Sequence, residues 1–292
     1  MERGELTMKR INVPAKDGAL ISAVTIDLDD SLKKAVVIIC HGFGEHSGAY
    51  IEVGEELQKG GFASIIPDLR GHGTPPEGAK KWHGQVPNYQ CFIDDIVSLT
   101  KTAKQIAPEK PIVLYGHSMG ANIIINTLLK LPPEETTVYS CAILETPWLE
   151  LYRPPGSLEM KLVKVLNIIA PRYRFMRKLN HEILSSDPER AGGYLIDPLY
   201  HGYISMRMGT GLIDGGKYAI ENAPCFPIPA FLAYADTDRV ISNKAIKEFA
   251  EKAGDIVTIK EYDSMHAIHN DKSRELFFND VVAFIDSHII ST

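Results

Sequence analysis

Short runs of apolar, β-branched residues alternate with longer amphipathic stretches along most of this chain. Predicted strands cover residues 11–14, 20–27, 35–40, 63–67, 112–115, 139–144, 230–235 and 257–261. Predicted helices cover residues 50–59, 88–106, 118–130, 243–253 and 272–290. Because strands that alternate with helices form a mostly parallel central sheet with helices on both faces, this pattern predicts an α/β fold.

The alternation stops between residues 146 and 229, where helical patches occur without a convincing strand. Unstructured loops longer than about 12–15 residues are uncommon within a compact domain. We therefore expect residues 1–145 and 230–292 to form one core domain. Residues 146–229 are expected to form an inserted helical cap, or lid.

The composition argues against several classes of protein. With 45% hydrophobic and 23% charged residues, the chain has ample material for a large core, unlike a disordered chain. Its net charge is −6 and no block of like charge occurs, which argues against nucleic acid as a partner. The histidines show no HExxH spacing and no GxGxxG loop is present, so no metal or other cofactor is predicted.

The cysteines and the apolar segments bear on where the protein resides. Four widely separated cysteines without a CxxC pair argue against a disulfide framework or a zinc site, and they indicate a reducing compartment. Residues 1–12 are charged and lack the apolar stretch of a signal peptide. The longest uncharged run, 111–129, contains Gly, His and Asn residues that a membrane core tolerates poorly. We therefore expect a cytoplasmic protein.

The strongest chemical signal is the pentapeptide Gly116-His117-Ser118-Met119-Gly120, which lies between a predicted strand and a predicted helix. A G-x-S-x-G sequence in this setting is typical of a sharp turn that exposes a nucleophilic serine at the top of the sheet. The motif predicts that Ser118 is a nucleophile. The alternative is a glycine-flanked serine that only caps the following helix.

A second glycine-rich loop, His41-Gly42-Phe43-Gly44, directly follows the apolar run 35–40. Glycines allow the backbone of such a loop to approach a substrate closely. We expect the backbone N–H groups of Phe43 and Met119 to form an oxyanion hole, which stabilises the negative oxygen of a tetrahedral intermediate. The alternative is an ordinary turn between a strand and a helix.

Four segments carry a resemblance to a known family. They are HGFGEHSGAY at 41–50, DLRGHG at 68–73, GHSMG at 116–120 and DPLYHGYIS at 197–205. Together they closely resemble the monoacylglycerol lipase and lysophospholipase branch of the α/β-hydrolase superfamily. The resemblance extends from about residue 11 to residue 290. It implies an α/β-hydrolase fold with a helical cap.

The resemblance also places the acid and the base of a catalytic triad, because the superfamily order is Ser, then acid, then His. Two aspartates compete for the acid, and the family pattern favours Asp238 over Asp236. Two histidines compete for the base, and the pattern favours His266 over His269. The family usually has a glycine shortly before this histidine, where the present chain has an Asp-Ser pair.

In related monoglyceride lipases, the residues that match Glu45 and His269 help to hold the glycerol head group. The resemblance therefore implies a substrate-binding role for both residues. The basic residue that usually precedes the tyrosine at the end of the 41–50 motif is replaced here by Ala49. The alternative for Glu45 is compensation of the positive dipole at a helix N-terminus.

Within the expected cap, residues 157–169 carry apolar side chains at positions 158, 162, 165, 166 and 169, which is typical of an amphipathic helix. The apolar face is expected to pack over the acyl pocket and the core. The alternative is transient contact with a membrane or micelle surface.

These features together predict a serine ester hydrolase that forms an acyl-enzyme on Ser118, with His266 as base and Asp238 as acid. The resemblance implies a small-molecule or lipid ester with one acyl chain as substrate, such as a monoacylglycerol or a lysophospholipid. Alternatives on the same triad are an aryl or feruloyl carboxylesterase and an acyltransferase. A hydrolase-like receptor with vestigial turnover is an alternative from another class. The oligomeric state stays open.

Overall fold

The computed structural model describes residues 7–76, 79, 81–177 and 180–289. Its main sheet has eight strands in the order β1-β2-β4-β3-β5-β6-β9-β10. These are β1 (Thr7–Pro14), β2 (Leu20–Asp27), β3 (Ala35–Cys40), β4 (Phe62–Pro67), β5 (Ile112–His117), β6 (Tyr139–Glu145), β9 (Ala230–Ala235) and β10 (Val257–Tyr262). The β1–β2 and β2–β4 pairs are antiparallel, and the remaining pairs are parallel. The predicted α/β class with a mostly parallel sheet is confirmed.

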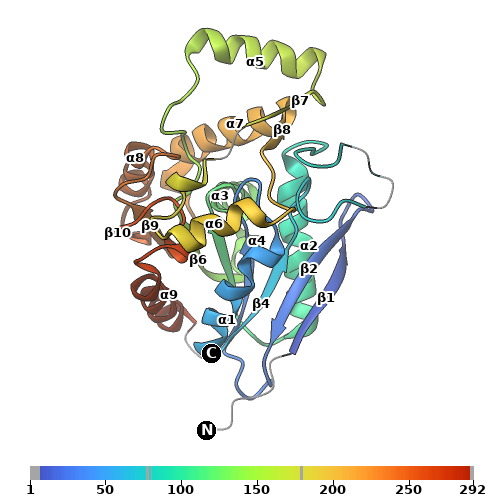
Figure 1. Ribbon diagram of the computed structural model, residues 1–292. Coiled ribbons are helices and arrows are strands. Elements are labelled where there is room, and N and C mark those ends of the chain that lie inside the picture. The colour runs from blue at the N-terminus through green and yellow to red at the C-terminus, as the bar shows by residue number, and fades with distance from the viewer. Residues whose placement is uncertain (1–6, 77–78, 80, 178–179, 290–292) are drawn as a thin grey trace.

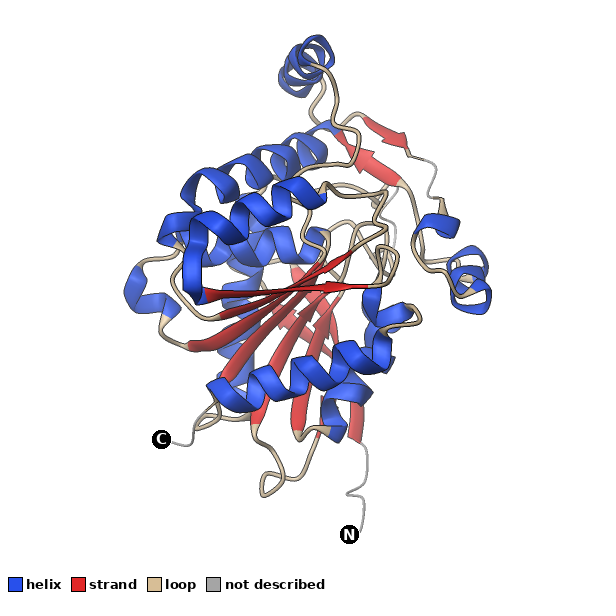
Figure 2. Ribbon diagram, turned by 90° about the vertical axis from the view of Figure 1, so that its left-hand side faces the viewer, coloured by secondary structure: helices blue, strands red, loops and turns tan. Residues whose placement is uncertain are grey.

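Helices cover both faces of this sheet (Figures 1 and 2). The longer ones beside the strands are α1 (Ile51–Lys59), α2 (Gln90–Ile106), α3 (Met119–Lys130), α8 (Asn243–Ala253) and α9 (Arg274–His288). Shorter elements are α4 (Pro133–Thr136), η1 (Ser47–Tyr50), η2 (His181–Ile183), η3 (Ala223–Cys225), η4 (Gly254–Ile256) and η5 (Ile268–Asn270). The last helix, which was predicted over residues 272–290, begins two residues later, at Arg274, and ends at His288. Ile290 lies outside the described residues.

The core consists of two hydrophobic clusters, one on each face of the sheet. Successive residues of β3 alternate between them, because side chains of a strand point to opposite faces. Ile38 packs in the cluster that includes α2, α3 and α8, whereas Ile39 packs in the cluster that includes α1 and α9. Complete burial of one such side chain contributes about 1.5–3 kcal/mol. The sheet is therefore a rigid support, and the loops at the carboxyl ends of its parallel strands are held in fixed positions.

The segment between β6 and β9 contains α5 (Ser157–Ile169), β7 (Arg174–Met176), α6 (Pro188–Ile196), β8 (Tyr203–Ser205) and α7 (Met206–Asn222). The expectation that this segment has no strand is wrong, because β7 and β8 form an antiparallel pair. Strands of three residues are too short to show a repeating pattern in the sequence. Part of the segment packs on the core, since the Asn126 side chain on α3 donates to Gly215 O on α7 (3.0 Å). The division into a core and a separate cap stays a prediction.

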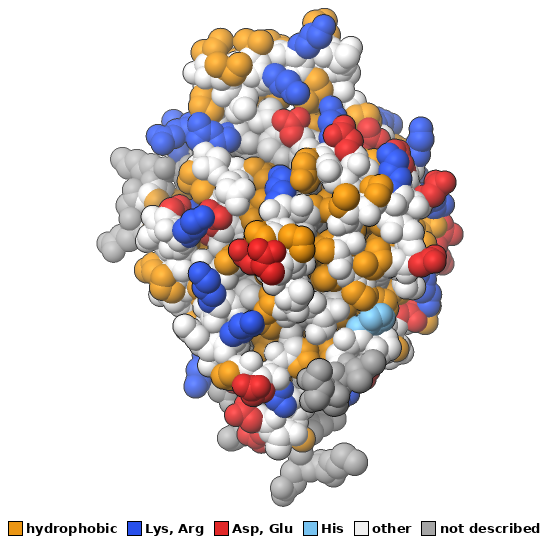
Figure 3. All heavy atoms as spheres, turned by 180° about the vertical axis from the view of Figure 1, so that it is seen from behind, with side chains coloured by type: hydrophobic (Ala, Val, Ile, Leu, Met, Phe, Trp, Pro, Cys, Tyr) orange, Lys and Arg blue, Asp and Glu red, His pale blue; other side chains and the backbone are white. Residues whose placement is uncertain are grey.

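Helix α5 forms over the predicted residues, but it does not pack as predicted. No residue of α5 is buried, and the exposed fractions of Leu158, Leu162 and Ile169 are 78%, 59% and 74%. The helix lies at the outer end of the molecule, beyond α7 (Figure 1), where hydrophobic side chains reach the surface (Figure 3). The expected burial of its apolar face over the pocket is therefore wrong. In the part of the chain that the structure describes, none of the helices combines the length and the hydrophobicity that a membrane span requires.

Candidate active site

Ser118 occupies a sharp turn between β5 and α3. Its φ angle is 49°, in the left-handed region that residues other than glycine rarely adopt. The turn brings two chain segments together so closely that a Cβ at Gly116 would lie 2.6 Å from Ala121 N, and one at Gly120 would overlap the Cys40 carbonyl. The Ser118 amide donates to Glu145 O at 2.9 Å, which holds the strained residue at the end of β6. The strand–turn–helix setting predicted for the pentapeptide is present.

Asp238 and His266 form a buried pair beside this turn. His266 Nδ1 lies 2.7 Å from Asp238 Oδ2, and the side chains are 3% and 0% exposed. The other oxygen of Asp238 accepts hydrogen bonds from the amides of Val240 (2.7 Å) and Ile241 (3.0 Å). Both oxygens are thereby fixed, so the carboxylate holds the imidazole in one orientation.

The competing aspartate, Asp236, is exposed and lies outside this pair. Its carboxylate accepts from the amide of Ser264 at 3.1 Å and therefore ties down the loop that precedes His266. The structure thus brings Asp238, and not Asp236, together with His266. The assignment of catalytic roles to these residues stays a prediction.

The two amides predicted to form the oxyanion hole belong to Phe43 and Met119. Among the described residues, neither amide has a hydrogen-bond acceptor. The turn at Gly42 is tight, because a Cβ there would lie 2.5 Å from Glu45 Oε2 and 2.8 Å from His117 Cδ2. Both Phe43 and Ser118 line the same cavity.

Glu45 is buried on the wall of that cavity. Its Oε2 accepts hydrogen bonds from the Gly42 amide (2.7 Å) and from the hydroxyl of Tyr50 (2.6 Å). Burial raises the pKa of Glu45, an effect that a nearby His269 and these hydrogen bonds oppose. Through these contacts Glu45 organises the loop that carries Phe43. This role differs from the alternative given above, in which Glu45 compensates the dipole at a helix N-terminus.

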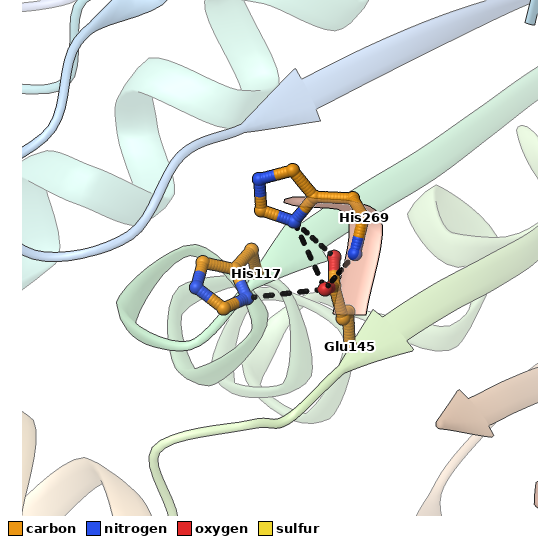
Figure 4. Close-up of side chains that lie close together, drawn as sticks. All are labelled: His117, Glu145 and His269. Carbon is orange, nitrogen blue, oxygen red and sulfur yellow. Dashed lines mark hydrogen bonds and ion pairs between the residues drawn. The ribbon is translucent and has the colours of Figure 1, made fainter. Parts of the chain in front are cut away.

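His269 is buried, and it is not among the described residues that line the cavity. Its Nδ1 and its amide contact Glu145 Oε1 at 2.9 and 3.0 Å (Figure 4). Burial opposes protonation of the ring, but the Glu145 carboxylate outweighs it and raises the pKa of His269. Burial likewise disfavours the Glu145 anion, yet His269 and His117 together lower the pKa of Glu145 to about 2. The expected contact of His269 with substrate stays a prediction.

Donor atoms of His117, Glu145 and His269 lie within 4.8 Å of one another, a spacing that could hold a metal ion. These atoms already have partners within the protein. Glu145 accepts from the Tyr115 hydroxyl at 2.5 Å, and His117 Nδ1 lies 3.1 Å from the Thr146 hydroxyl. The group is therefore a hydrogen-bonded network under Ser118. The sequence analysis missed Glu145, although an acidic residue that directly follows an apolar strand was a visible signal.

The cavity above these groups has a volume of about 160 Å³. The core contributes Gly42, Phe43, Glu45, His117, Ser118, Arg239, Val240 and His266 to its wall. The segment between β6 and β9 contributes Trp148, Leu151, Arg177, Asn180, His181, Ile183, Leu184, Tyr194, Leu195 and Tyr200. None of this second group was predicted from the sequence, because lining residues from irregular segments follow no spacing. They place that segment over Ser118 and His266.

Comparisons with known proteins agree with this geometry. Residues 31–273 match the family model Hydrolase_4, described as serine aminopeptidase, S33. The chain is 28% identical to a monoacylglycerol lipase of Mycolicibacterium smegmatis, over 89% of this chain and 91% of the relative. It is also 28% identical to a monoglyceride lipase of Rattus norvegicus, over 82% of this chain and 77% of that one.

A solved structure of a soluble variant of the monoglyceride lipase of Saccharomyces cerevisiae, in complex with a substrate analogue, has the same fold. The TM-score is 0.83 at 21% identity, with 100% of this chain and 97% of the other covered. The family model covers well over half of the present chain. The chain therefore belongs to the Hydrolase_4 (serine aminopeptidase, S33) family and is a serine hydrolase of the monoacylglycerol lipase branch of the α/β-hydrolase superfamily.

Proposed function

We propose that the protein hydrolyses carboxylic esters with a single acyl chain, such as monoacylglycerols, through an acyl-enzyme on Ser118. The observation that carries this proposal is the placement of Ser118 and His266 on the wall of one cavity, with His266 bonded to Asp238 at 2.7 Å. A serine hydroxyl next to an imidazole, which is in turn held by a buried carboxylate, is the arrangement that catalyses acyl transfer.

In the proposed reaction, Asp238 accepts a hydrogen bond from the Nδ1–H of His266, which keeps the proton on Nδ1 and leaves the lone pair of Nε2 free to act as a base. Nε2 takes the proton of the Ser118 hydroxyl as the oxygen attacks the ester carbonyl. The amides of Phe43 and Met119 stabilise the resulting oxyanion, and each such donor typically contributes about 10²–10³-fold to the rate. His266 then protonates the leaving alcohol and activates water to release the acid.

The shape of the cavity supports a substrate with one acyl chain. Its volume of about 160 Å³ and its lining of Leu151, Ile183, Leu184 and Val240 suit a single hydrocarbon chain. Each buried CH₂ group contributes about 0.8 kcal/mol, so affinity should increase with chain length until the space is filled. A triacylglycerol would leave two chains without a place. We therefore propose that residues 146–229 act as a cap that excludes it.

The polar end of the cavity is proposed to receive the alcohol part of the ester. Glu45 reaches the cavity from the core, and Tyr194 and Tyr200 reach it from α6 and the loop that follows α6. His269 is proposed to act on this end through its charge, since it is not among the described residues that line the cavity. Because Ala49 supplies no cation, we propose only modest discrimination between glycerol and simple alcohols.

The exposed apolar residues of α5 support transient contact with a lipid surface. Elsewhere in the segment between β6 and β9, Tyr173 (61%), Met176 (66%) and Ile196 (84%) are also exposed. Several exposed apolar residues on one helix, such as Leu158, Leu162 and Ile169 of α5, usually mark an interaction site. We propose that this helix contacts a membrane or micelle that supplies the substrate. A cytoplasmic location stays part of the proposal and rests on four cysteines without a disulfide partner.

The test is a panel of p-nitrophenyl esters of graded chain length, with a monoacylglycerol and an amino-acid p-nitroanilide as further substrates. The proposal expects ester hydrolysis with an optimum chain length and no anilide cleavage. Ser118→Ala serves as the control for background hydrolysis. Anilide cleavage without ester hydrolysis would favour a peptidase, and binding of the esters without turnover would favour a receptor.

A further inference from the structure

The residue after β6 has a backbone conformation that its side chain disfavours. Thr146 has a φ angle of 41°, and it is a β-branched residue, for which positive φ is a genuine outlier. Glycine would adopt this angle without strain. Strain of this kind persists only where the surroundings enforce it, and it is concentrated at functional sites. A threonine at this position offers what a glycine lacks, a hydroxyl group.

That hydroxyl connects two of the segments that carry the proposed triad. Thr146 Oγ1 donates to the backbone carbonyl of His266 at 3.0 Å, and it lies 3.1 Å from Nδ1 of His117, the neighbour of Ser118. A carbonyl can only accept, so the single hydroxyl proton goes to His266 O. His117 Nδ1 must then donate to Thr146 Oγ1, which fixes the His117 tautomer.

The backbone of the same residue reaches the third segment. The Thr146 amide donates to Ala233 O at 2.8 Å, on strand β9, which leads to Asp238. The preceding residue contributes in parallel, because Glu145 O accepts from the Ser118 amide at 2.9 Å. Thr146 is itself completely buried, so these bonds are shielded from water.

We propose that Thr146 is a positioning residue, whose hydroxyl fixes the backbone of His266 relative to the turn that carries Ser118. This inference rests on the proposed function, since it concerns the same Ser118–His266 pair. Thr146 does not line the cavity and so acts through His266. A displacement of a catalytic group by about 1 Å can lower a rate by about 10²-fold, so a bond that holds the backbone of His266 in place matters for the rate.

The test compares Thr146→Val with Thr146→Ser. Valine keeps the shape and the β-branch but removes the hydroxyl, whereas serine keeps the hydroxyl. We expect Thr146→Val to lower kcat by about 10–100-fold with KM changed less than about threefold. Thr146→Ser should retain most of the wild-type kcat. The rate of labelling by a fluorophosphonate probe, which reports the reactivity of Ser118, should fall in Thr146→Val by the same factor as kcat.

Thr127→Val is the matched control. Thr127 is also completely buried and its hydroxyl donates to Ile123 O at 2.8 Å, within α3 and away from the cavity. It should lose thermal stability without losing kcat per folded molecule. If Thr146→Val does not fold, Thr146→Ala gives the same comparison, because alanine also lacks the hydroxyl and carries no β-branch.

Two results would overturn the inference. One is a wild-type kcat and labelling rate in folded Thr146→Val or Thr146→Ala. The other is an equal loss of kcat in Thr146→Ser and Thr146→Val, which would assign the effect to packing. Failure of the proposed function has a different signature: the wild type would be labelled but would hydrolyse none of the esters. In that case the labelling rates still decide the role of Thr146.

Discussion

His266 Nδ1 lies 2.7 Å from Asp238 Oδ2, in a pair whose side chains are almost completely shielded from water. Shielding strengthens such a contact, since the local dielectric constant is lower than that of water. Asp238→Asn should lower kcat by about 10⁴-fold, because an amide favours the wrong imidazole tautomer. Asp236→Asn should lower kcat far less, because its carboxylate binds the Ser264 amide instead of the His266 ring. Steady-state kinetics of the two variants measure the difference. The reverse order of effects would move the acid to Asp236.

Ser118→Ala should fold like the wild type and lower kcat by about 10⁴-fold or more. Alanine removes only the hydroxyl, and the turn is held by backbone contacts to Glu145 and Trp148. A fluorophosphonate probe should label the wild type and leave this variant unlabelled, as mass spectrometry can establish. Labelling that persists in Ser118→Ala would identify another nucleophile.

The two neighbouring histidines should behave differently. His266→Ala should abolish ester hydrolysis, since no other described imidazole that lines the cavity is bonded to Asp238. His269→Ala should keep measurable kcat, with a raised KM and a lower melting temperature, because it leaves the buried Glu145 carboxylate without its cation. If His269→Ala were inactive and His266→Ala active, His269 and not His266 would be the base.

The sequence predicted the parts of the site that follow regular patterns. Ser118 directly follows β5, and Phe43 lies in the loop that follows β3; the carboxyl ends of such parallel strands meet at one edge of the sheet. The choice between Asp236 and Asp238 needed a family pattern, because both follow the same strand. Glu145 and Thr146 were missed because their importance arises from contacts with the loop of His266, about 120 residues later in the chain.

The fold was predictable for a similar reason, whereas the packing of α5 was not. Strand β3 buries every residue, so its apolar run has a single interpretation. The face of α5 is as apolar as a buried helix face, yet Leu158 is 78% exposed. Periodicity indicates that a helix has an apolar side, but it does not say whether protein or a lipid surface covers that side.

The Glu145–His269 pair should make stability depend on pH in two ranges. The folded pKa of His269 is raised above 6.5, so its contribution is complete below about pH 6.5 and is lost as pH rises through the folded pKa. The pKa of Glu145 is lowered from 4.5 to about 2, so its contribution is present above about pH 4.5 and is lost as pH falls toward 2. Together they predict the greatest stabilisation between about pH 4.5 and 6.5.

Urea unfolding of the wild type and of Glu145→Gln across this range measures the effect. The difference in free energy of unfolding between the two proteins should be largest between those pH values and should shrink on both sides. Glu248→Gln is the control, because Glu248 pairs with Lys252 on the surface of α8 and should show little dependence. A pH-independent difference would mean that the Glu145–His269 pair is not ionised in the folded protein.

The last prediction concerns the substrate that the cap admits. Leu184 and Tyr194, both in the proposed cap, line the same cavity as Ser118, and we expect this cavity to hold one acyl chain. At equal acyl length, kcat/KM should be similar for a monoacylglycerol and its matched methyl ester, and much lower for the triacylglycerol. Ala49→Arg should favour the monoacylglycerol over the methyl ester, because it adds a cation near the loop of Glu45. Assays in detergent below its critical micelle concentration separate this selectivity from surface binding through α5. Rapid turnover of emulsified triacylglycerol would show that the cap leaves the site open to larger esters.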